Sequence, residues 1–315
     1  MSLFSNRGRR PRLAPELDDA DLGKLLKRLT SNTRSSTPGT TDLCVAQIAR
    51  FLEQNPGDFD LRAHRVSVLA GFLSESNLPA AWVQRDPSNA SALVLHSWSA
   101  VERGRAAGRL TDASSVWERC QLVAELDPRD PTPWVVMLSV ARLERYPTSD
   151  VFATWNEIVT RDRWHREAYL GMLEYLSPQE SGSIAQVVDF VDSVRGRMPS
   201  NAPCAAVELA AHVMQYHAAV SRGGAQALLA RNHWNTPQAA DLLERARTTW
   251  PQRTFFSHAA ALADLNLLAY ALTAANRRRQ AAPLFTAIGG SVTSWPWRFE
   301  GDPLAAFESA HHKAR

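Results

Sequence analysis

Short turns interrupt this sequence at intervals, and each turn separates two segments whose apolar residues follow helical spacing. The clearest case is residues 125–142, ELDPRDPTPWVVMLSVAR, where Asp127-Pro128 marks the turn. Proline cannot continue a helix, and aspartate often begins the next one as its N-cap. This stretch therefore predicts a helix, a tight turn and a second helix.

The same arrangement recurs along most of the chain. Six candidate junctions, 31 to 52 residues apart, are Asn55-Pro56, Asp86-Pro87, Asp127-Pro128, Asp162-Arg163, Met198-Pro199 and Trp250-Pro251. Apolar triplets precede five of them: Cys44/Ile48/Phe51, Val116/Cys120/Val123, Val151/Trp155/Ile158, Val187/Val191/Val194 and Ala239/Leu243/Ala246. Spacing of i, i+4 and i+7 places each triplet on one helix face. The Pro87 junction lacks such a triplet, which predicts a short or irregular helix before it.

Polar residues mark the start of the helix after each junction. Two residues past the second junction position stand Asp58, Asn89, Asp130, His165, Asn201 and Arg253. Four of these six are Asp or Asn, whose side chains accept hydrogen bonds from the first N–H groups of a helix. Because one helix pair cannot bury its apolar face alone, the pairs are expected to stack.

The junction spacing scatters around the ~34 residues of a tetratricopeptide repeat, and the order of residue types is similar to that family. The fold class predicted is all-α: a tetratricopeptide-like α-solenoid of about six helix pairs over residues 42–315. An ordinary α-helical bundle with proline-capped helices is the alternative.

Residues 1–41 are expected to lie outside the solenoid. Residues 1–15 are rich in arginine and proline and are expected to be disordered. Leu22, Leu25, Leu26 and Leu29 predict a short helix over residues 16–29, and residues 31–41 read as a linker. The tail is either a solvated end or an electrostatic arm that makes a weak contact with an acidic partner. The arginines that would make this contact are Arg7, Arg9, Arg10 and Arg12.

The end of the chain departs from the repeat. Residues 254–276 and 278–288 predict a helix pair that Gly289-Gly290 ends, and residues 302–312 predict a last short helix. The intervening segment, SVTSWPWRFEG, lacks helical spacing. Trp295 and Trp297 are expected to fold back and cap the array, as solenoid ends require. The alternative is that they anchor a ligand or a partner.

Composition excludes several classes of function. The net charge of +3 lies mostly in the first 34 residues, so the folded part lacks the basic stripe of a nucleic-acid binder. No run of residues predicts a membrane span or a secretory signal. Three distant cysteines without a CxxC motif fit a reducing compartment. We therefore expect a cytoplasmic protein with no nucleic-acid partner.

Motifs that carry chemistry were not found. The sequence contains no phosphate-binding glycine loop, no nucleophile elbow and no metalloprotease motif. His212 and His217 lie five residues apart, which separates them widely around a helix. Cys44 and Cys120 fall in the predicted buried triplets. The prediction is a protein without a catalytic residue, a metal site or a cofactor.

A binding site is then expected on the concave face of the array, along the first helix of each pair. The polar candidates on these helices are His96, Glu102, Arg103, Ser139, Arg142, Glu174, Glu208, His212 and Asn266. Each could equally be a solvated or locally paired side chain. Their mixed polarity favours a segment of another protein over a single anion.

Four segments together resemble one family. ELDPRDPTPWVVMLSVARL (125–143), HREAYLGMLEYLSP followed by GS (165–183), SALVLHSWSAVERGR (91–105) and AIGG followed by SWPWRF (287–299) are similar to an actinobacterial tetratricopeptide-like family. The family is classed as a domain of unknown function, number 4034. The resemblance implies a cytosolic all-α repeat protein and implies no established activity.

The function predicted is a non-catalytic interaction scaffold that holds a segment of another protein from the same organism. Two alternatives stay open. One is an enzyme, or an accessory subunit of one, with a small-molecule pocket inside the superhelix. The other is a structural assembly component.

Overall fold

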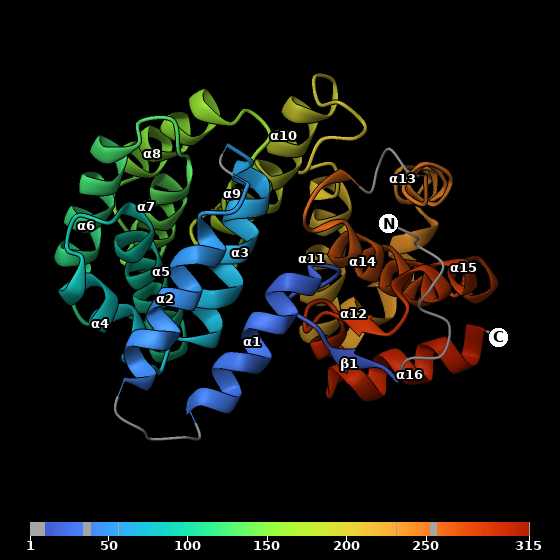
Figure 1. The fold of residues 1–315 in the computed structure, drawn as a ribbon. Helices are drawn as coiled ribbons and strands as arrows, with labels where there is room; N and C mark the ends of the chain where they lie inside the picture. Colours follow the sequence, from blue (N-terminus) through green and yellow to red (C-terminus); the bar gives the residue numbers. More distant parts are fainter. Residues whose placement is uncertain (1–9, 34–38, 56, 231, 253–256, 315) are drawn as a thin grey trace. The chain divides into compact units, whose positions relative to one another are not determined.

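The computed structural model describes residues 10–33, 39–55, 57–230, 232–252 and 257–314. Apart from two short strands, two 3₁₀ turns and the connecting loops, these residues are helical (Figure 1). The chain divides into two compact units, residues 19–175 and residues 1–18 with 176–315. This division differs from the single array over residues 42–315 that the sequence predicts.

The unit of residues 19–175 contains nine helices in the part that is described. They are α1 (Ala20–Thr33), α2 (Thr40–Leu52), α3 (Phe59–Phe72), α4 (Leu78–Arg85), α5 (Ala90–Ala107), α6 (Ala113–Leu126), α7 (Thr132–Leu143), α8 (Thr148–Arg161) and α9 (Arg166–Tyr175). Helices α3, α5, α7 and α9 form one layer, in which each contacts the next. Helices α2, α4, α6 and α8 pack on that layer, and α6 lies against both α5 and α7.

The predicted triplets form much of the buried surface between these helices. Cys44, Ile48 and Phe51 are buried on α2, and Val116, Cys120 and Val123 on α6. On α8, Val151 and Ile158 are buried, whereas Trp155 is half-buried. Helix α4, which precedes the Pro87 junction, has only 8 residues, as predicted. The helical spacing of the sequence is thus confirmed by burial.

Polar caps begin several of the helices. Asp58 accepts a hydrogen bond from the Leu61 N–H, and Asn89 accepts one from the Ala92 N–H, so both predicted N-caps are confirmed. Asp130 accepts from the Thr132 N–H at 2.8 Å and is also bound by Arg62. The predicted cap at Asn201 is wrong, because α11 begins only at Val207. Arg253 lies outside the described residues.

The second unit contains β1 (Arg12–Leu13), α10 (Ile184–Arg195), α11 (Val207–Ser221), α12 (Gly224–Ala230), η1 (His233–Asn235), α13 (Pro237–Thr249), α14 (Ala261–Ala274), α15 (Arg278–Ile288), β2 (Ser291–Val292), η3 (Trp297–Glu300) and α16 (Pro303–Ala314). Helix α14 is mostly apolar and is buried among α11, α13, α15 and α16. The triplet on α13 is buried, as are Val187 and Val191 on α10. The predicted long helix over residues 254–276 is shorter in the structure, and residues 254–256 lie outside the described part.

The N-terminal segment corrects a prediction. Residues 10–15 are not a disordered tail: β1 pairs in parallel with β2, and the Ala14 N–H donates to the Val292 carbonyl at 3.0 Å. Arg12 forms an ion pair with the buried Glu16, so Arg12 is a structural residue. Composition could not predict this contact, because the partner strand lies about 280 residues away in the sequence. Arg10 is exposed, and Arg7 and Arg9 lie outside the described residues.

No helix in the described part of the chain is both long and apolar enough to cross a membrane.

Candidate functional site

The candidates on α5, α7 and α9 do not form one open face. Arg105, which the sequence reasoning missed, donates to Glu102 at 2.8 Å and to Ser139 at 3.0 Å. The contact with Ser139 links α5 to α7. Arg142 on α7 donates to Glu174 on α9 at 2.5 Å. Three of the predicted binding residues, Ser139, Arg142 and Glu174, are therefore engaged in contacts between neighbouring helices, and Glu102 is engaged in a contact within α5.

Close packing supports the Arg142 contact. The Arg142 side chain is mostly buried, and a Cβ atom at Gly171 would lie 3.2 Å from its Nη1 atom. Glycine at position 171 thus leaves room for the guanidinium beside α9. Ser139 is also buried, and its hydroxyl donates to the Val135 carbonyl at 3.2 Å. The prediction of Ser139 as a surface contact is wrong for this reason.

His96 and Arg103 lie on a different face of α5. Both line a cavity of about 320 Å³ at the turn between α5 and α6, whereas Glu102 points toward Arg105. Positions 96 and 103 are seven residues apart, so they share one side of the helix. The predicted face is therefore divided between an inter-helix contact and a cavity.

The candidates in the second unit are largely structural. Glu208 is buried and forms ion pairs with Arg195 at 2.7 Å and Arg245 at 3.3 Å. Its prediction as a partner contact is wrong, because both carboxylate oxygens are already bound. The His212 Nδ1 atom lies 3.3 Å from His233 Nε2. Burial is the main cause that lowers the pKa of His212 to about 4.

The prediction of Asn266 as a partner-binding residue is wrong, because Asn266 is fully buried on α14. Its Nδ2 atom donates to the carbonyls of Leu262 and Ser291, and its Oδ1 atom accepts from Trp297 Nε1 at 3.0 Å. It cannot contact a partner, and its role is to fix the segment after α15 onto α14.

The two tryptophans differ in their environments. Trp297 is buried against Tyr270, Phe285 and Phe307, which come from α14, α15 and α16. It therefore packs over the last helices, as the capping interpretation expects. Trp295 is half-buried.

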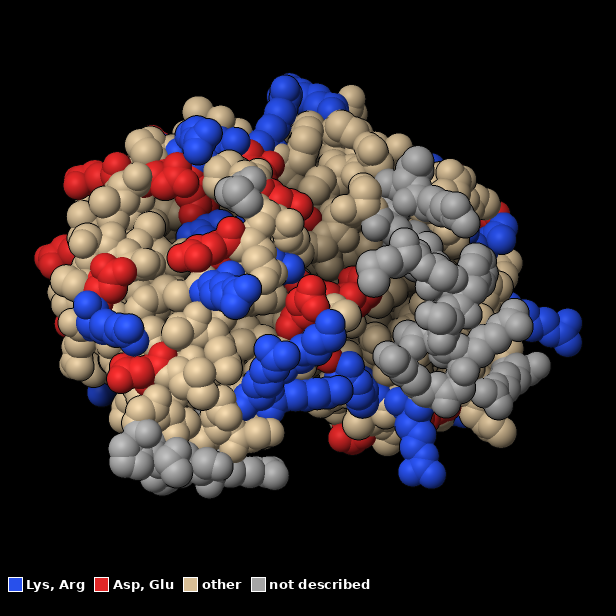
Figure 2. All heavy atoms as spheres, viewed as in Figure 1, with Lys and Arg blue, Asp and Glu red and all other residues tan. Residues whose placement is uncertain are grey.

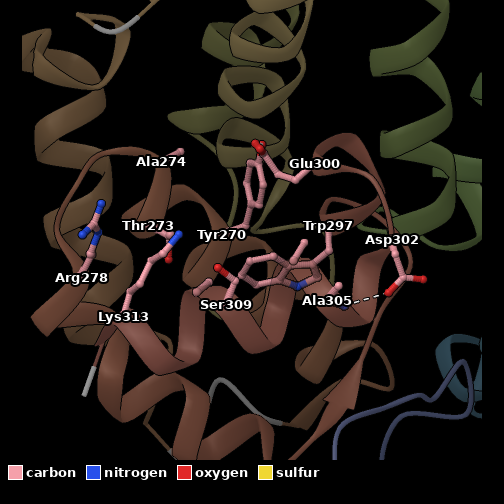
Figure 3. A pocket seen from close by; sticks show the side chains of 12 residues that line it. Tyr270, Thr273, Ala274, Arg278, Trp297, Glu300, Asp302, Ala305, Ser309 and Lys313 are labelled. Carbon is pink, nitrogen blue, oxygen red and sulfur yellow. Dashed lines mark hydrogen bonds between the residues drawn. The ribbon is translucent and has the colours of Figure 1, made fainter.

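A cavity of about 490 Å³ lies beside Trp297, between α14, η3 and α16 (Figure 3). Small side chains of Ala274, Ala305, Ala306 and Ala310 form much of its wall. Polar and aromatic residues complete the lining: Tyr270, Thr273, Arg278, Trp297, Glu300, Asp302, Ser309 and Lys313. We call this cavity the α14–α16 pocket.

The charges in the α14–α16 pocket are separated. In Figure 3, Arg278 and Lys313 lie at one end, and Glu300 and Asp302 lie toward the other. Glu300 accepts a hydrogen bond from Tyr270 at 2.9 Å, and Asp302 caps α16 through the Ala305 N–H. The acidic end is thus held in place, whereas Arg278 and Lys313 form no ion pair within the described residues.

Tyr270 connects the pocket to buried groups behind it. Its hydroxyl lies 2.9 Å from His217 Nε2, and the His217 ring stacks on Phe299. Burial, followed by the nearby Glu300, raises the pKa of Tyr270. Burial and the nearby Arg298 lower the pKa of His217 to about 4. At neutral pH the phenol is protonated and the imidazole is neutral, so neither group is poised for proton transfer.

The pocket residues could not be found from repeat positions. Arg278, Glu300, Asp302 and Lys313 occur outside the repeats, at helix ends and in the segment interpreted as a cap. A signal was present, because Asp302 begins the predicted last helix and Lys313 directly follows it. The side chains form a site only because Trp297 holds η3 between α14 and α16.

On the face drawn in Figure 2, positive and negative side chains are interspersed.

In comparisons with known proteins, the chain matches no family model and no curated protein. The resemblance to the tetratricopeptide-like family therefore stays a prediction.

Proposed function

We propose that this protein is a non-catalytic interaction scaffold that holds a short segment of a partner protein in the α14–α16 pocket. The separation of charge along this pocket carries the proposal. A bound segment would place an acidic group against Arg278 and Lys313 and a basic group against Glu300 and Asp302. Such complementarity favours one orientation of the segment and rejects wrong partners.

The rest of the lining suits a peptide better than a compact ion. Four alanines leave space for a main chain to approach, and Thr273 and Ser309 offer hydroxyl groups to peptide amides.

The helical architecture supports a scaffold as well. We propose that α2–α9 form tetratricopeptide-like repeats of an α-solenoid. The support is that α3, α5, α7 and α9 contact one another in order, with a second layer packed on them. Arrays of this kind present extended surfaces to other proteins. The three buried free cysteines support the proposal of a cytoplasmic location.

The ionisable groups also favour binding over catalysis. Burial lowers the pKa of His96, His212 and His217 to about 4 and raises that of Cys120 to about 12. These shifts keep the imidazoles neutral and the thiol protonated at neutral pH. A nucleophile or general base would need a pKa near the working pH.

A peptide selection tests the proposal. A random-peptide phage library is selected on the purified protein, and enriched peptides are measured by isothermal titration calorimetry. We expect a consensus with an acidic residue, and we expect the double variant Arg278→Glu, Lys313→Glu to lose binding.

The chain offers a matched control for this charge reversal. Arg279 is the next residue on α15, is exposed and does not line the pocket. Arg279→Glu makes the same change in charge and should bind as the wild type does. Equal binding by the wild type and the Arg278/Lys313 double variant would refute the pocket as the site.

A further inference from the structure

The α5–α6 turn contains a second cavity, of about 320 Å³, in the unit of residues 19–175. The charged and polar groups that line it are His96, Arg103, Arg109, Thr111, Asp112 and Arg119. We call it the α5–α6 pocket. The packing of two helices does not require three arginines around a cavity of this size.

The local sequence explains why the arginines converge. Gly108 ends α5 in a left-handed conformation with φ of 79°, which reverses the chain. A Cβ atom at Gly104 would lie 2.6 Å from Leu110 Cδ2, so glycine lets the turn pack closely against α5. The turn carries Arg109 back toward Arg103 on α5, and Arg119 approaches from α6.

The arginines that line the pocket form few hydrogen bonds or ion pairs with the described residues of the protein. Arg119 donates to the Ser97 hydroxyl at 3.4 Å, which is a long contact. Arg103 and Arg109 are exposed and form no ion pair within the described part of the chain. The His96 Nδ1 atom is buried and has no hydrogen-bond partner there. The guanidinium groups of Arg103 and Arg109 are therefore available to a ligand.

The lining of the α5–α6 pocket contains one carboxylate, that of Asp112, which is engaged in capping a helix. Asp112 caps α6, accepting from the Ser115 N–H at 3.1 Å and from the Ser114 hydroxyl at 3.0 Å. These hydrogen bonds lower the pKa of Asp112. Three guanidinium groups and one carboxylate leave the lining with a net charge of +2. That charge matches a phosphate monoester, which carries about −2 at neutral pH.

We propose that the α5–α6 pocket binds a small molecule that carries a phosphate group, with Arg103, Arg109 and Arg119 around the phosphate oxygens. Guanidinium groups bind phosphate in a bidentate manner, and several of them together give strong, oriented binding. This proposal is independent of the peptide pocket, which lies in the other unit.

Calorimetric titration with pyrophosphate, in a buffer free of other polyanions, tests the proposal. We expect a saturable one-site isotherm for the wild type and a loss of affinity of about tenfold or more for Arg103→Gln and for Arg109→Gln. Both arginines are exposed, so neither change should unfold the protein. Circular dichroism of each variant verifies this.

Arg129→Gln is the matched control. Arg129 is exposed, belongs to the same unit and lies outside the pocket, so this variant should bind as the wild type does. Citrate, a carboxylate anion of similar charge, should bind at least about tenfold more weakly than pyrophosphate if the site is built for phosphate. No saturable isotherm for the wild type would overturn the proposal, as would equal losses in Arg103→Gln and Arg129→Gln. Equal affinity for citrate and pyrophosphate would overturn the assignment to phosphate.

Discussion

Asn266 Oδ1 accepts a hydrogen bond from Trp297 Nε1 at 3.0 Å, and this contact joins the most buried helix of the second unit to the wall of the α14–α16 pocket. The same amide donates to the Ser291 carbonyl at 3.0 Å. One side chain thus fixes both β2 and η3. The pocket depends on this arrangement, because Trp297 and Glu300 reach it from η3.

Asn266→Ala should therefore destabilise the second unit. It leaves the Trp297 N–H and the Ser291 carbonyl buried without a partner, at a cost of about 1–3 kcal/mol for each group. A urea titration followed by tryptophan fluorescence measures the loss. Gln186→Ala, an exposed change on α10, should alter the free energy of unfolding by less than ~0.5 kcal/mol. A similar effect of the two changes would contradict this role of Asn266.

Arg65 and Asp19 form a mostly buried ion pair at 2.7 Å that links α3 to the start of α1. Asp19 also caps α1 through the Leu22 N–H, and Arg65 lies over the Phe51 ring. Arg65→Ala leaves a buried carboxylate without its partner, and we expect a loss of about 3 kcal/mol. A double-mutant cycle with Asp19→Ala should give a coupling energy above ~1 kcal/mol.

The exposed pair of Arg85 and Asp42, at 3.3 Å, provides the comparison for that cycle. Solvent screens this pair, so its coupling energy should be below ~0.5 kcal/mol. Equal coupling in the two cycles would show that burial does not strengthen the Arg65–Asp19 contact.

Acidification should destabilise the second unit through His217. Burial and the nearby Arg298 lower the pKa of His217 from the ordinary histidine value of 6.5 to about 4 in the folded protein. The unfolded chain thus binds the proton more readily, and stability is lost as the pH falls from about 6.5 toward 4. His217→Gln should reduce the loss of stability between pH 7 and pH 5 by ~1 kcal/mol, after allowance for partial exposure.

The urea midpoint at each pH measures this effect, and His312→Gln controls for removal of an exposed imidazole. The groups near His217 include the Tyr270 hydroxyl, the Phe299 ring, the Tyr216 ring and Arg298. The same pH slope in His217→Gln and the wild type would mean that other groups control the acid response.

The cysteines should be unreactive in the folded protein. Cys44, Cys120 and Cys204 are buried and free, and burial raises the pKa of Cys120 to about 12. Because the thiolate is the reactive form, labelling with a disulfide reagent at pH 8 should be slow in buffer and fast in urea. Rapid labelling of one thiol in buffer would contradict its burial.

Sequence reasoning predicted the helices well because apolar spacing is a local signal. The triplets on α2, α6 and α13 are buried, and α15 has the predicted bounds. Sequence reasoning failed where a contact joins residues that are distant in the sequence. Strand β1 pairs with β2, and Asn266 accepts a hydrogen bond from Trp297. A buried asparagine and an exposed one look alike in a sequence, so only the packing assigns Asn266 to the interior.

The candidate sites were predictable to a smaller extent. His96, Glu102 and Arg103 were predicted as candidates on one helix, and the structure places His96 and Arg103, but not Glu102, at the α5–α6 pocket. Arg109 and Arg119 join them through a turn whose geometry depends on Gly104 and Gly108. Helical spacing does not encode that approach, so the sequence did not predict the cavity.

Site-specific photo-crosslinking tests the central claim most directly. Ser309 lines the α14–α16 pocket, whereas the adjacent Glu308 is exposed and does not. A benzophenone amino acid is placed at each position in turn, and the protein is irradiated in its native cells. We predict that position 309 crosslinks to one segment of one partner protein, that position 308 does not, and that Arg278→Glu removes the product. The same products from both positions, or none from position 309, would contradict the account.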